Sequence, residues 1–444
     1  MTRSASEPLD DGTIIIEPDA NPVAVSTAVL DPFTEGGGPG TPPKKRKRTR
    51  LRKRFPRTFR VLMVIFAVFL TIAIWASWSF YQAVRTSEGE PLEVIAATWA
   101  RDHGLGSAVA VAEDFYYQHI ETTPEGGVPT ESTTIDDGAS AEPAAPAPAK
   151  SAPGKPSTAP AIPVVGHLTP PDRVQSPAGK PLPNEGVWQP TKGTVAGVPA
   201  VYVTRVRPDN VHTSVLVSMM WFDTNLAKFG FVPGYQEPGG PSPTDGAMPA
   251  SWQDTALASF NGGFRLQDSR GGYYYNGDTV APLSDGAASA VIYKDGSMKI
   301  GEWGRTGLTM SKDVAVVRQN LDLIVDKGQA QTFATDSGAR WGATTDGASL
   351  AWRSAVGQRK DGSIVYIGSP GLSASSLAST LVDAGVQRAM ILDMNNWWVA
   401  GFYYSHTANG QIKCANLDPA IQEGCDRFLK RYKRDNFAVL GKTF

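Results

Sequence analysis

VLMVIFAVFLTIAIWASWSFYQAV, residues 61–84, is a run of 24 residues without a charged side chain, and it decides how the rest of the chain is arranged. At about 1.5 Å of rise per residue, a helix of this length crosses a hydrocarbon core of roughly 30 Å. The run is longer than the apolar part of a cleavable signal peptide, and its leader is more extended. The sequence therefore predicts one transmembrane helix over residues 61–84.

The charges that flank this run differ on its two sides. Eleven Lys and Arg residues lie between Lys44 and Arg60, whereas Arg85 stands almost alone on the other side. Positively charged flanks stay in the cytoplasm. We therefore expect residues 1–60 to be a disordered cytoplasmic tail with a basic cluster, and residues 85–444 to lie outside the cell membrane.

Composition divides the external part into three segments. Residues 85–120 are predicted to form a membrane-proximal helical segment. Residues 121–185 are expected to be a linker rich in Pro, Ala and Ser, because 12 prolines fall among residues 137–183 and favour an extended stalk that lifts the domain away from the bilayer. The external part carries 30 basic and 36 acidic residues, and this acidic balance argues against nucleic acid as a partner.

Residues 186–444 are long enough for one domain, which we predict to be of the α/β class (an α+β mixed sheet). Val, Thr and aromatic residues alternate in predicted strands, which cover residues 200–207, 213–223, 256–260, 288–293 and 298–303. The repeated Lys-Asp-Gly-Ser at residues 294–297 and 360–363 predicts two hairpins with type I′ turns. A helix from Ser373 to Gly385, with strands on either side, predicts a parallel strand pair.

The chain has two cysteines, Cys414 and Cys425. In an oxidising compartment a disulfide between them is the expected state, and the alternative of a metal site lacks a His at ligand spacing.

Several motifs carry residues suited to binding a sugar or a phosphate. Asn261-Gly262-Gly263 can form an anion-binding nest, or simply a tight turn. Arg353 is suited to bidentate phosphate binding, its alternative being an ordinary ion pair. Asp393 follows an apolar strand, a favoured position for a site.

The order of these motifs resembles the phosphodiester glycosidase family (the uncovering-enzyme-like domain), and most closely its actinobacterial membrane-anchored type. The resemblance covers residues 186–404 and implies an α/β fold that hydrolyses a sugar–phosphate diester. The family's glycine turn after Leu-Asp is replaced by Met394-Asn395-Asn396-Trp397. Phosphate contact at that turn is therefore expected to change.

The resemblance and the residue types together give a set of expected roles. Asp393 is expected to be catalytic, as general acid/base or nucleophile, with Asp278 as the second carboxylate that glycosidases use. The substrate-binding residues are expected to be Asn261, Gly262, Gly263, Arg265, Tyr275, Arg353, Asn395, Asn396 and Trp397.

Two functions from different classes follow. The first is a membrane-anchored hydrolase of glycosyl phosphodiesters in the cell envelope, and the alternative is a non-catalytic module that binds envelope glycan or acts as a scaffold on the same fold. No cofactor is expected, although a divalent cation near Asp393 is left open. Convergence of Asn261, Arg353 and Asp393 on one pocket would favour the enzyme.

Overall fold

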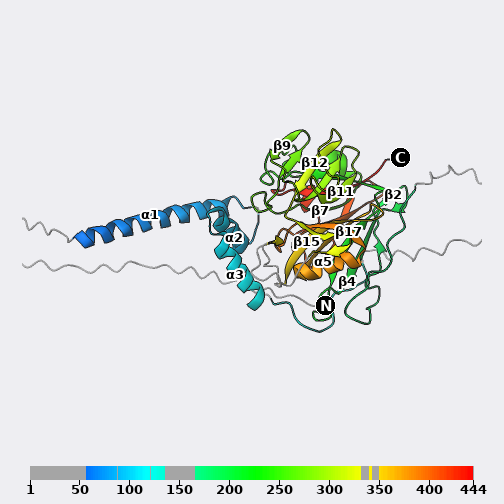
Figure 1. Cartoon of the computed structure of the whole chain (residues 1–444), viewed down its shortest axis with the longest axis horizontal. Coiled ribbons are helices and arrows are strands. Elements are labelled where there is room, and N and C mark those ends of the chain that lie inside the picture. Colours follow the sequence, from blue (N-terminus) through cyan, green and yellow to red (C-terminus); the bar gives the residue numbers. More distant parts are fainter. Residues whose placement is uncertain are drawn as a thin grey trace, which may run out of the picture. The chain divides into compact units, whose positions relative to one another are not determined.

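A computed structural model of the chain describes residues 57–87, 89–120, 122–135, 166–331, 340–342 and 350–443. Figure 1 shows a helical N-terminal part followed by a domain rich in strands. Three large sheets build the domain, and every strand pair within them is antiparallel. The mixed α and β character predicted for the domain is confirmed. Residues 1–56, which include the predicted tail and basic cluster, lie outside the described residues.

The strands of the first sheet are, in spatial order, β1 (Gln189–Pro190), β4 (Val201–Val206), β5 (Val217–Phe222), β16 (Ile364–Leu372), β15 (Ala351–Arg359), β17 (Val386–Ile391), β13 (Leu323–Asp326) and β14 (Gln329–Ala330). The second sheet contains β11 (Met298–Glu302), β10 (Ala288–Tyr293), β12 (Val314–Gln319), β8 (Tyr273–Tyr275) and β9 (Asp278–Ala281). The third contains β19 (Ile412–Asn416), β18 (Gly401–His406), β7 (Ala256–Asn261), β20 (Asn436–Gly441) and β6 (Ala227–Val232). Two short strands, β2 (Thr194–Val195) and β3 (Val198–Pro199), form a separate pair.

The first sheet is buried on both faces. Met219 and Trp221 of β5 point into one apolar cluster, which includes α5 (Ala374–Asp383). Met220 and Phe222, the alternate residues of the same strand, point into a second cluster shared with the other two large sheets. Since side chains alternate across a strand, burial on both faces explains why β5 is apolar throughout.

The helix α5 begins and ends as the sequence predicts. The Ser373 side chain accepts a hydrogen bond from the Ser376 backbone N–H in a capping box, and Gly385 adopts φ of +78° after the last turn. The predicted parallel pair around it is wrong, because β15 lies between β16 and β17 and pairs antiparallel with both. The two flanking strands run in the same direction without touching as neighbours.

Both predicted Asp-Gly hairpins are present, but their turns are not of type I′. Gly296 and Gly362 have φ of +82° and +88°, whereas the aspartates before them do not have positive φ. Each aspartate instead accepts a hydrogen bond from the serine two residues later. A type I turn followed by a left-handed glycine explains this geometry.

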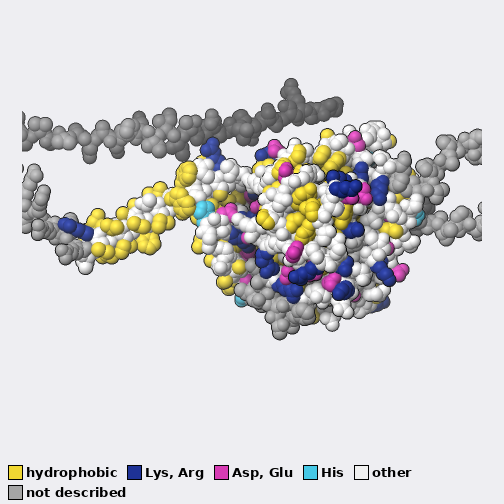
Figure 2. All heavy atoms as spheres, turned by 45° about the horizontal axis from the view of Figure 1, so that its top comes forward, with side chains coloured by type: hydrophobic (Ala, Val, Ile, Leu, Met, Phe, Trp, Pro, Cys, Tyr) yellow, Lys and Arg dark blue, Asp and Glu magenta, His cyan; other side chains and the backbone are white. Residues whose placement is uncertain are grey.

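Three helices precede the domain: α1 (Arg57–Arg85), α2 (Leu92–Asp102) and α3 (Gly106–His119). Residues 58–85 of α1 are long and apolar enough to cross a membrane. Figure 2 shows hydrophobic side chains covering α1, whereas acidic and basic side chains mix over the visible face of the domain. The predicted helical character of residues 85–120 is confirmed, with a break at Gly104, whose φ is +80°. A short helix, α4 (Ala250–Gln253), and a 3₁₀ helix (Arg427–Leu429) complete the described helices.

The domain begins before residue 186, where the sequence analysis placed its boundary. Val174 is 2% exposed in an apolar cluster, and the Leu168 N–H donates to Asp223 at 2.7 Å. Residues 126–135 also contact the domain, and Arg205 donates to the Ser132 carbonyl at 2.7 Å. The described parts of the predicted linker therefore pack on the domain and do not lift it away from the helices. Proline content predicted an extended segment but could not reveal its distant partners.

Cys414 and Cys425 form the expected disulfide, which joins β19 to the loop before the 3₁₀ helix.

The strongest tie between the N-terminal edge and the sheet is the buried pair of Glu185 and Arg207. Arg207 Nε and Nη2 donate to the two carboxylate oxygens of Glu185, each at 2.9 Å. Burial opposes ionisation of Glu185, but hydrogen bonds from the Arg207 side chain and from the backbone N–H groups of Leu182 and Arg207 lower its pKa to about 2.

We expect Glu185→Gln to lower the free energy of unfolding by about 3–5 kcal/mol, because it leaves the Arg207 guanidinium buried without its counter-charge. Thermal unfolding of the full-length protein in detergent measures the change. In the wild type, the contribution of Glu185 is present above the unfolded-state pKa of about 4.3 and is lost as pH falls toward 2.

The matched control is Glu302→Gln. Glu302 pairs with Arg305 at 3.9 Å, and the Arg305 side chain is 65% exposed, so its loss should change stability by less than about 1 kcal/mol. Equal effects of the two substitutions would show that residues 166–185 add nothing to the domain.

Candidate active site

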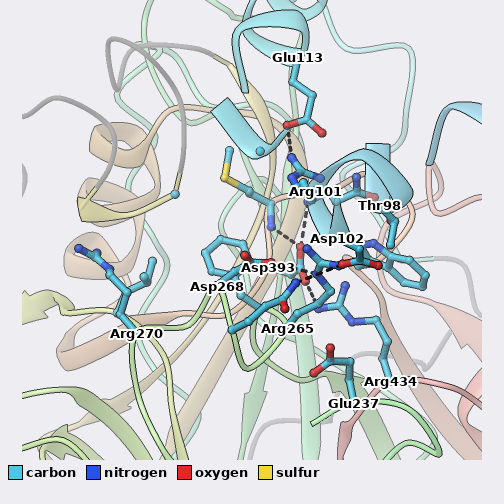
Figure 3. Close-up of a pocket in the computed structure, with 18 of the residues that line it drawn as sticks. Thr98, Arg101, Asp102, Glu113, Glu237, Arg265, Asp268, Arg270, Asp393 and Arg434 are labelled. Carbon is cyan, nitrogen blue, oxygen red and sulfur yellow. Dashed lines mark hydrogen bonds and ion pairs between the residues drawn. The ribbon is translucent and has the colours of Figure 1, made fainter. Parts of the chain in front are cut away.

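A cavity of about 500 Å³ is lined by polar and charged side chains from distant parts of the chain. Figure 3 shows ten of them, from α2, α3 and the loops of the domain, pointing toward one another. The charged members are Arg101, Asp102, Glu113, Asp114, Glu237, Arg265, Asp268, Arg270, Asp393, Lys433 and Arg434. The described part of the chain thus has one cavity in which both signs of charge gather around Asp393.

Asp393 follows β17 and lies at the inner wall of this cavity. Its Oδ1 accepts hydrogen bonds from the backbone N–H groups of Met394 and Asn395, at 2.8 and 3.1 Å. Its Oδ2 accepts one from Arg434 Nη2 at 2.9 Å. Burial raises the pKa of Asp393, and Arg434 and the two N–H groups oppose this rise. These three donors all favour the carboxylate over the neutral acid.

Arg434 is held where it can face both Asp393 and the cavity. Its guanidinium also donates to the Gly263 carbonyl at 3.0 Å and lies 4.7 Å from the Trp398 ring centroid. Burial alone would lower the pKa of Arg434, but Asp393 and Asp435 raise it. A fixed positive charge therefore lies beside Asp393.

A second ion pair supports this wall from below. Arg318 donates to the Asp435 carboxylate at 2.9 Å, and the two side chains are 0% and 1% exposed. The Gly262 N–H donates to the Asp435 carbonyl at 2.9 Å. A Cβ on Gly262 would come within 2.3 Å of the Asp435 carboxylate. Gly262 is therefore required for close packing, and its amide is bound to the chain itself.

Asn261 was predicted to bind sugar, but its side chain is fully engaged inside the domain. Its Nδ2 donates to the Gly262 carbonyl and to Ser354 Oγ, and its Oδ1 accepts from Tyr366 Oη and the Ala400 N–H. Ser354 Oγ in turn accepts from the Asp393 N–H at 3.0 Å. Asn261 lies behind Asp393 as a positioning residue and does not line the cavity.

Arg353 was predicted to bind phosphate, and it is also behind the cavity wall. It is 1% exposed, and its Nε donates to the Leu372 carbonyl at 2.8 Å. Burial lowers the pKa of Arg353 to about 10. Since strand β15 runs through the middle of its sheet, a side chain on it points into packed interior and not toward the cavity.

Asp278 and Tyr275 do not reach the cavity either. Asp278 is exposed at the start of β9, where it is paired in register with Tyr275 of β8. The Tyr275 ring packs near Phe231, at a centroid distance of 6.5 Å. The glycine-rich sequence that precedes these residues suggested a binding loop, but it leads into an edge hairpin.

The remaining predicted residues are divided between the cavity and its surroundings. Arg265 and Asn395 line the cavity. The Gly263 carbonyl accepts from Arg434, as described above. Trp397 and Asn396 do not line it, and the Trp397 ring lies 5.4 Å from the Arg427 guanidinium.

Glu237 is a cavity residue that sequence reasoning missed. It follows β6, and its Oε2 accepts a hydrogen bond from the Leu266 N–H at 3.0 Å. Burial raises the pKa of Glu237, and this hydrogen bond and the charge of Arg434 partly oppose the rise. Asp393 and Glu237 are therefore two carboxylates with raised pKa values that share Arg434 as a neighbour (Figure 3).

Lys433 and Arg434 were also missed, although the sequence held a signal for them. The segment Lys430-Arg431-Tyr432-Lys433-Arg434 is a basic run immediately before the last apolar strand. Such a run is usually a solvated face. Here β20 lies beside β7, and this pairing brings the end of the run to the Asn261 end of β7.

Acidic side chains of α2, and of the segment before it, contact the cations of the domain. Asp102 forms an ion pair with Arg265, and Glu90 forms one with Lys433. Arg101 pairs with Glu113 between α2 and α3. The helices thus form part of the cavity wall and carry most of its acidic groups.

Residues 254–393 match the sequence model of the phosphodiester glycosidase family. The match begins just before β7 and ends at Asp393, so it contains Asn261, Gly262 and Arg353. It confirms the resemblance over this part of the chain and supports its assignment as a phosphodiester glycosidase. No curated protein sequence matches the chain.

Three solved structures illustrate the similarity of fold. The catalytic domain of zebrafish N-acetylglucosamine-1-phosphodiester alpha-N-acetylglucosaminidase, auto-inhibited by its pro-peptide, is 14% identical, with 57% of this chain and 87% of that chain covered and a TM-score of 0.34. A hypothetical protein from Synechocystis is 10% identical, with 55% and 62% covered and a TM-score of 0.31. An exported protein from Burkholderia pseudomallei is 12% identical, with 51% and 74% covered and a TM-score of 0.27.

Gly262→Ala tests the packing beneath the site. The added methyl group collides with the Asp435 carboxylate and disturbs its ion pair with Arg318, so we expect a loss of about 3 kcal/mol or more of stability. Thermal unfolding measures it, with Gly166→Ala as the control, since no atom lies within 4 Å of a Cβ at Gly166. Unchanged unfolding of the Gly262 variant would contradict the described packing.

Proposed function

We propose that this domain hydrolyses glycosyl phosphodiesters. The observation that carries the proposal is the Asp393 carboxylate, which ends the family match and lies in a cavity with Arg434 at 2.9 Å. A carboxylate beside a fixed cation suits a reaction that separates a cationic sugar from an anionic phosphate.

The reaction breaks the bond between the anomeric carbon and the phosphate oxygen. A water oxygen forms the new bond to that carbon, one water proton passes to a carboxylate, and the phosphate leaves as a monoester with the bonding electrons. Asp393 stabilises the positive charge that develops on the sugar ring. A phosphate monoester leaves readily, so the leaving group needs no strong general acid.

Glu237 is the residue that we assign to take the proton from water. A general base works best when its pKa is near the working pH, and burial raises the pKa of Glu237 toward that range. Glu237 replaces Asp278 as the second carboxylate, because Asp278 is exposed on an edge hairpin.

The phosphate is assigned to the cations of the domain. Arg265, Arg270, Lys433 and Arg434 all line the cavity. Arg265 Nη2 is buried and has no hydrogen-bond partner among the described residues, so a phosphate oxygen would satisfy it. Arg is well suited to this task because its guanidinium can donate two parallel hydrogen bonds to a phosphate.

The proposed location is the outer side of the cell membrane, with α1 as the single anchor and residues 1–60 in the cytoplasm. The length and hydropathy of α1 support the anchor, and the excess of Lys and Arg before it supports the orientation. The proposed substrates are then glycosyl phosphodiesters of the cell envelope.

Asp393→Asn should lower kcat by at least about 100-fold, because an amide cannot supply the negative charge that stabilises the transition state. The assay follows sugar release by the full-length protein from methyl phosphodiesters of glucose, galactose, mannose and N-acetylglucosamine 1-phosphates, in both anomers. Asp278→Asn is the matched control and should keep the wild-type rate.

An Asp393→Asn variant as active as the wild type would overturn the role of Asp393. Absence of turnover by the wild type, together with binding of envelope glycan, would favour the binding module instead. The altered turn at Met394-Asn395-Asn396 is the feature that motivates this alternative.

The pH dependence of kcat/KM provides a separate test. Glu237 must be ionised to accept a proton, so activity should be lost as pH falls through its raised pKa, at a midpoint above the ordinary glutamate value of about 4.3. Glu237→Gln should abolish this base and lower kcat by about 100-fold or more. An acid limb that stays at the ordinary value would argue against Glu237 as the base.

A further inference from the structure

The helix α3 has its apolar face outside and its polar face inside. Val111, Phe115 and Tyr116 are 59%, 56% and 42% exposed. Glu113, Asp114 and Tyr117 line the cavity. Helices on a protein surface normally show the opposite arrangement, so the outer stripe of α3 is suited to a contact outside the domain.

The helix α2 connects the cavity to the end of α1. On one side, Trp99 Nε1 donates to Ser79 Oγ at 3.0 Å, and the Trp99 ring lies 5.7 Å from the Phe80 ring. On the other side, Arg101 and Asp102 line the cavity (Figure 3). One helix therefore separates the last turns of α1 from the cavity.

The chain leaves little distance between the proposed membrane span and these helices. Residues 86–91 separate the end of α1 from the start of α2. Near the end of α1, Trp75, Trp78 and Tyr81 are exposed, as is typical of residues at the boundary of a bilayer. Residues 72–85 belong to the same compact unit as the domain.

These observations favour the outer leaflet as the occupant of the α3 stripe. A helix that lies in a membrane interface buries one apolar face among lipid and keeps its polar face away from it. The α3 stripe is within reach of the leaflet because α2 is packed on the end of the span. A second protein chain would have to displace lipid that the anchor itself brings close.

We infer that α3 lies on the outer leaflet by Val111, Phe115 and Tyr116, and that the cavity behind it takes a glycosyl phosphodiester whose phosphate is attached to a lipid. The substrate assignment rests on the proposed hydrolase function. Water would supply the oxygen of the released sugar, and the lipid would keep its phosphate as a monoester. The cations Arg265 and Lys433 would meet that phosphate close to the level of lipid headgroups.

The membrane contact can be measured without any turnover. A spin label at Phe115→Cys, in full-length protein reconstituted into vesicles of phosphatidylcholine and phosphatidylglycerol, should be accessible to oxygen and shielded from a water-soluble nickel complex. Met310→Cys is the matched control, since Met310 is 46% exposed on the domain, and its label should report water. A water-like signal at residue 115 would overturn the membrane contact.

The substrate class is tested with two sets of sugar 1-phosphodiesters. One set is the soluble methyl esters used above, and the other carries hexadecyl groups in the same vesicles. We expect kcat/KM at least tenfold higher for the hexadecyl esters. Combined Val111→Ser, Phe115→Ser and Tyr116→Ser should raise KM for these esters about tenfold or more and leave methyl-ester turnover unchanged, whereas Met310→Ser should change neither.

The outcomes separate the two proposals. Turnover of methyl esters with equal or lower kcat/KM for hexadecyl esters would overturn the lipid-linked substrate and leave the hydrolase function standing. A loss of methyl-ester turnover in the triple serine variant would show that the stripe supports the fold of the site and would overturn its membrane role. Absence of turnover with both sets would overturn the hydrolase function and the substrate assignment with it, and the spin label would still decide the membrane contact.

Discussion

The burial of the Asp393 carboxylate is the constraint on which the rest of this site depends. A carboxylate that is 3% exposed is costly unless hydrogen bonds and a counter-charge compensate for the lost water. Two backbone N–H groups and Arg434 provide this compensation. Arg434 comes from the segment before β20, so the site exists only when the C-terminal strand is in place beside β7.

The same constraint explains the charges around Asp393. Arg434 needs further acidic neighbours, and Glu237 and Asp435 are among those that raise its pKa. Asp435 is in turn neutralised by Arg318. Each buried charge is thus held by another, and only Asp393, Glu237 and Arg434 of this group also line the cavity. The network leaves chemistry on one side and support on the other.

Local patterns predicted much of the fold. The alternation of apolar residues located β4, β5, β7, β10 and β11, and the capping residues located α5. These features depend on residues that are close in sequence, where side-chain period and turn chemistry act directly. The pairing of β16 and β17 on opposite sides of β15 was missed, because strand order depends on contacts that no local pattern records.

The site was harder to predict for the same reason. Asp393 was identified because a carboxylate after an apolar strand is unusual in itself. Its partner Arg434 is 41 positions away, and the ion pair of Asp102 with Arg265 joins residues 163 positions apart. Arg353 and Asn261 have the residue types of a binding site, but their strands place them behind the wall. Residue type indicated the region, and only packing distinguishes the cavity side from the supporting side.

The unusual turn after Asp393 is compatible with a working carboxylate. Met394 and Asn395 replace the glycines of the family pattern, yet the contacts they make to Asp393 come from their backbone N–H groups. Those donors do not depend on the side chains. Room for the Met394 side chain comes from Gly342, where a Cβ would lie 2.2 Å from the Met394 sulfur. The substitution therefore changes the shape of the cavity while it preserves the donors that hold the charge, and we expect it to affect which substrate fits more than whether the reaction occurs.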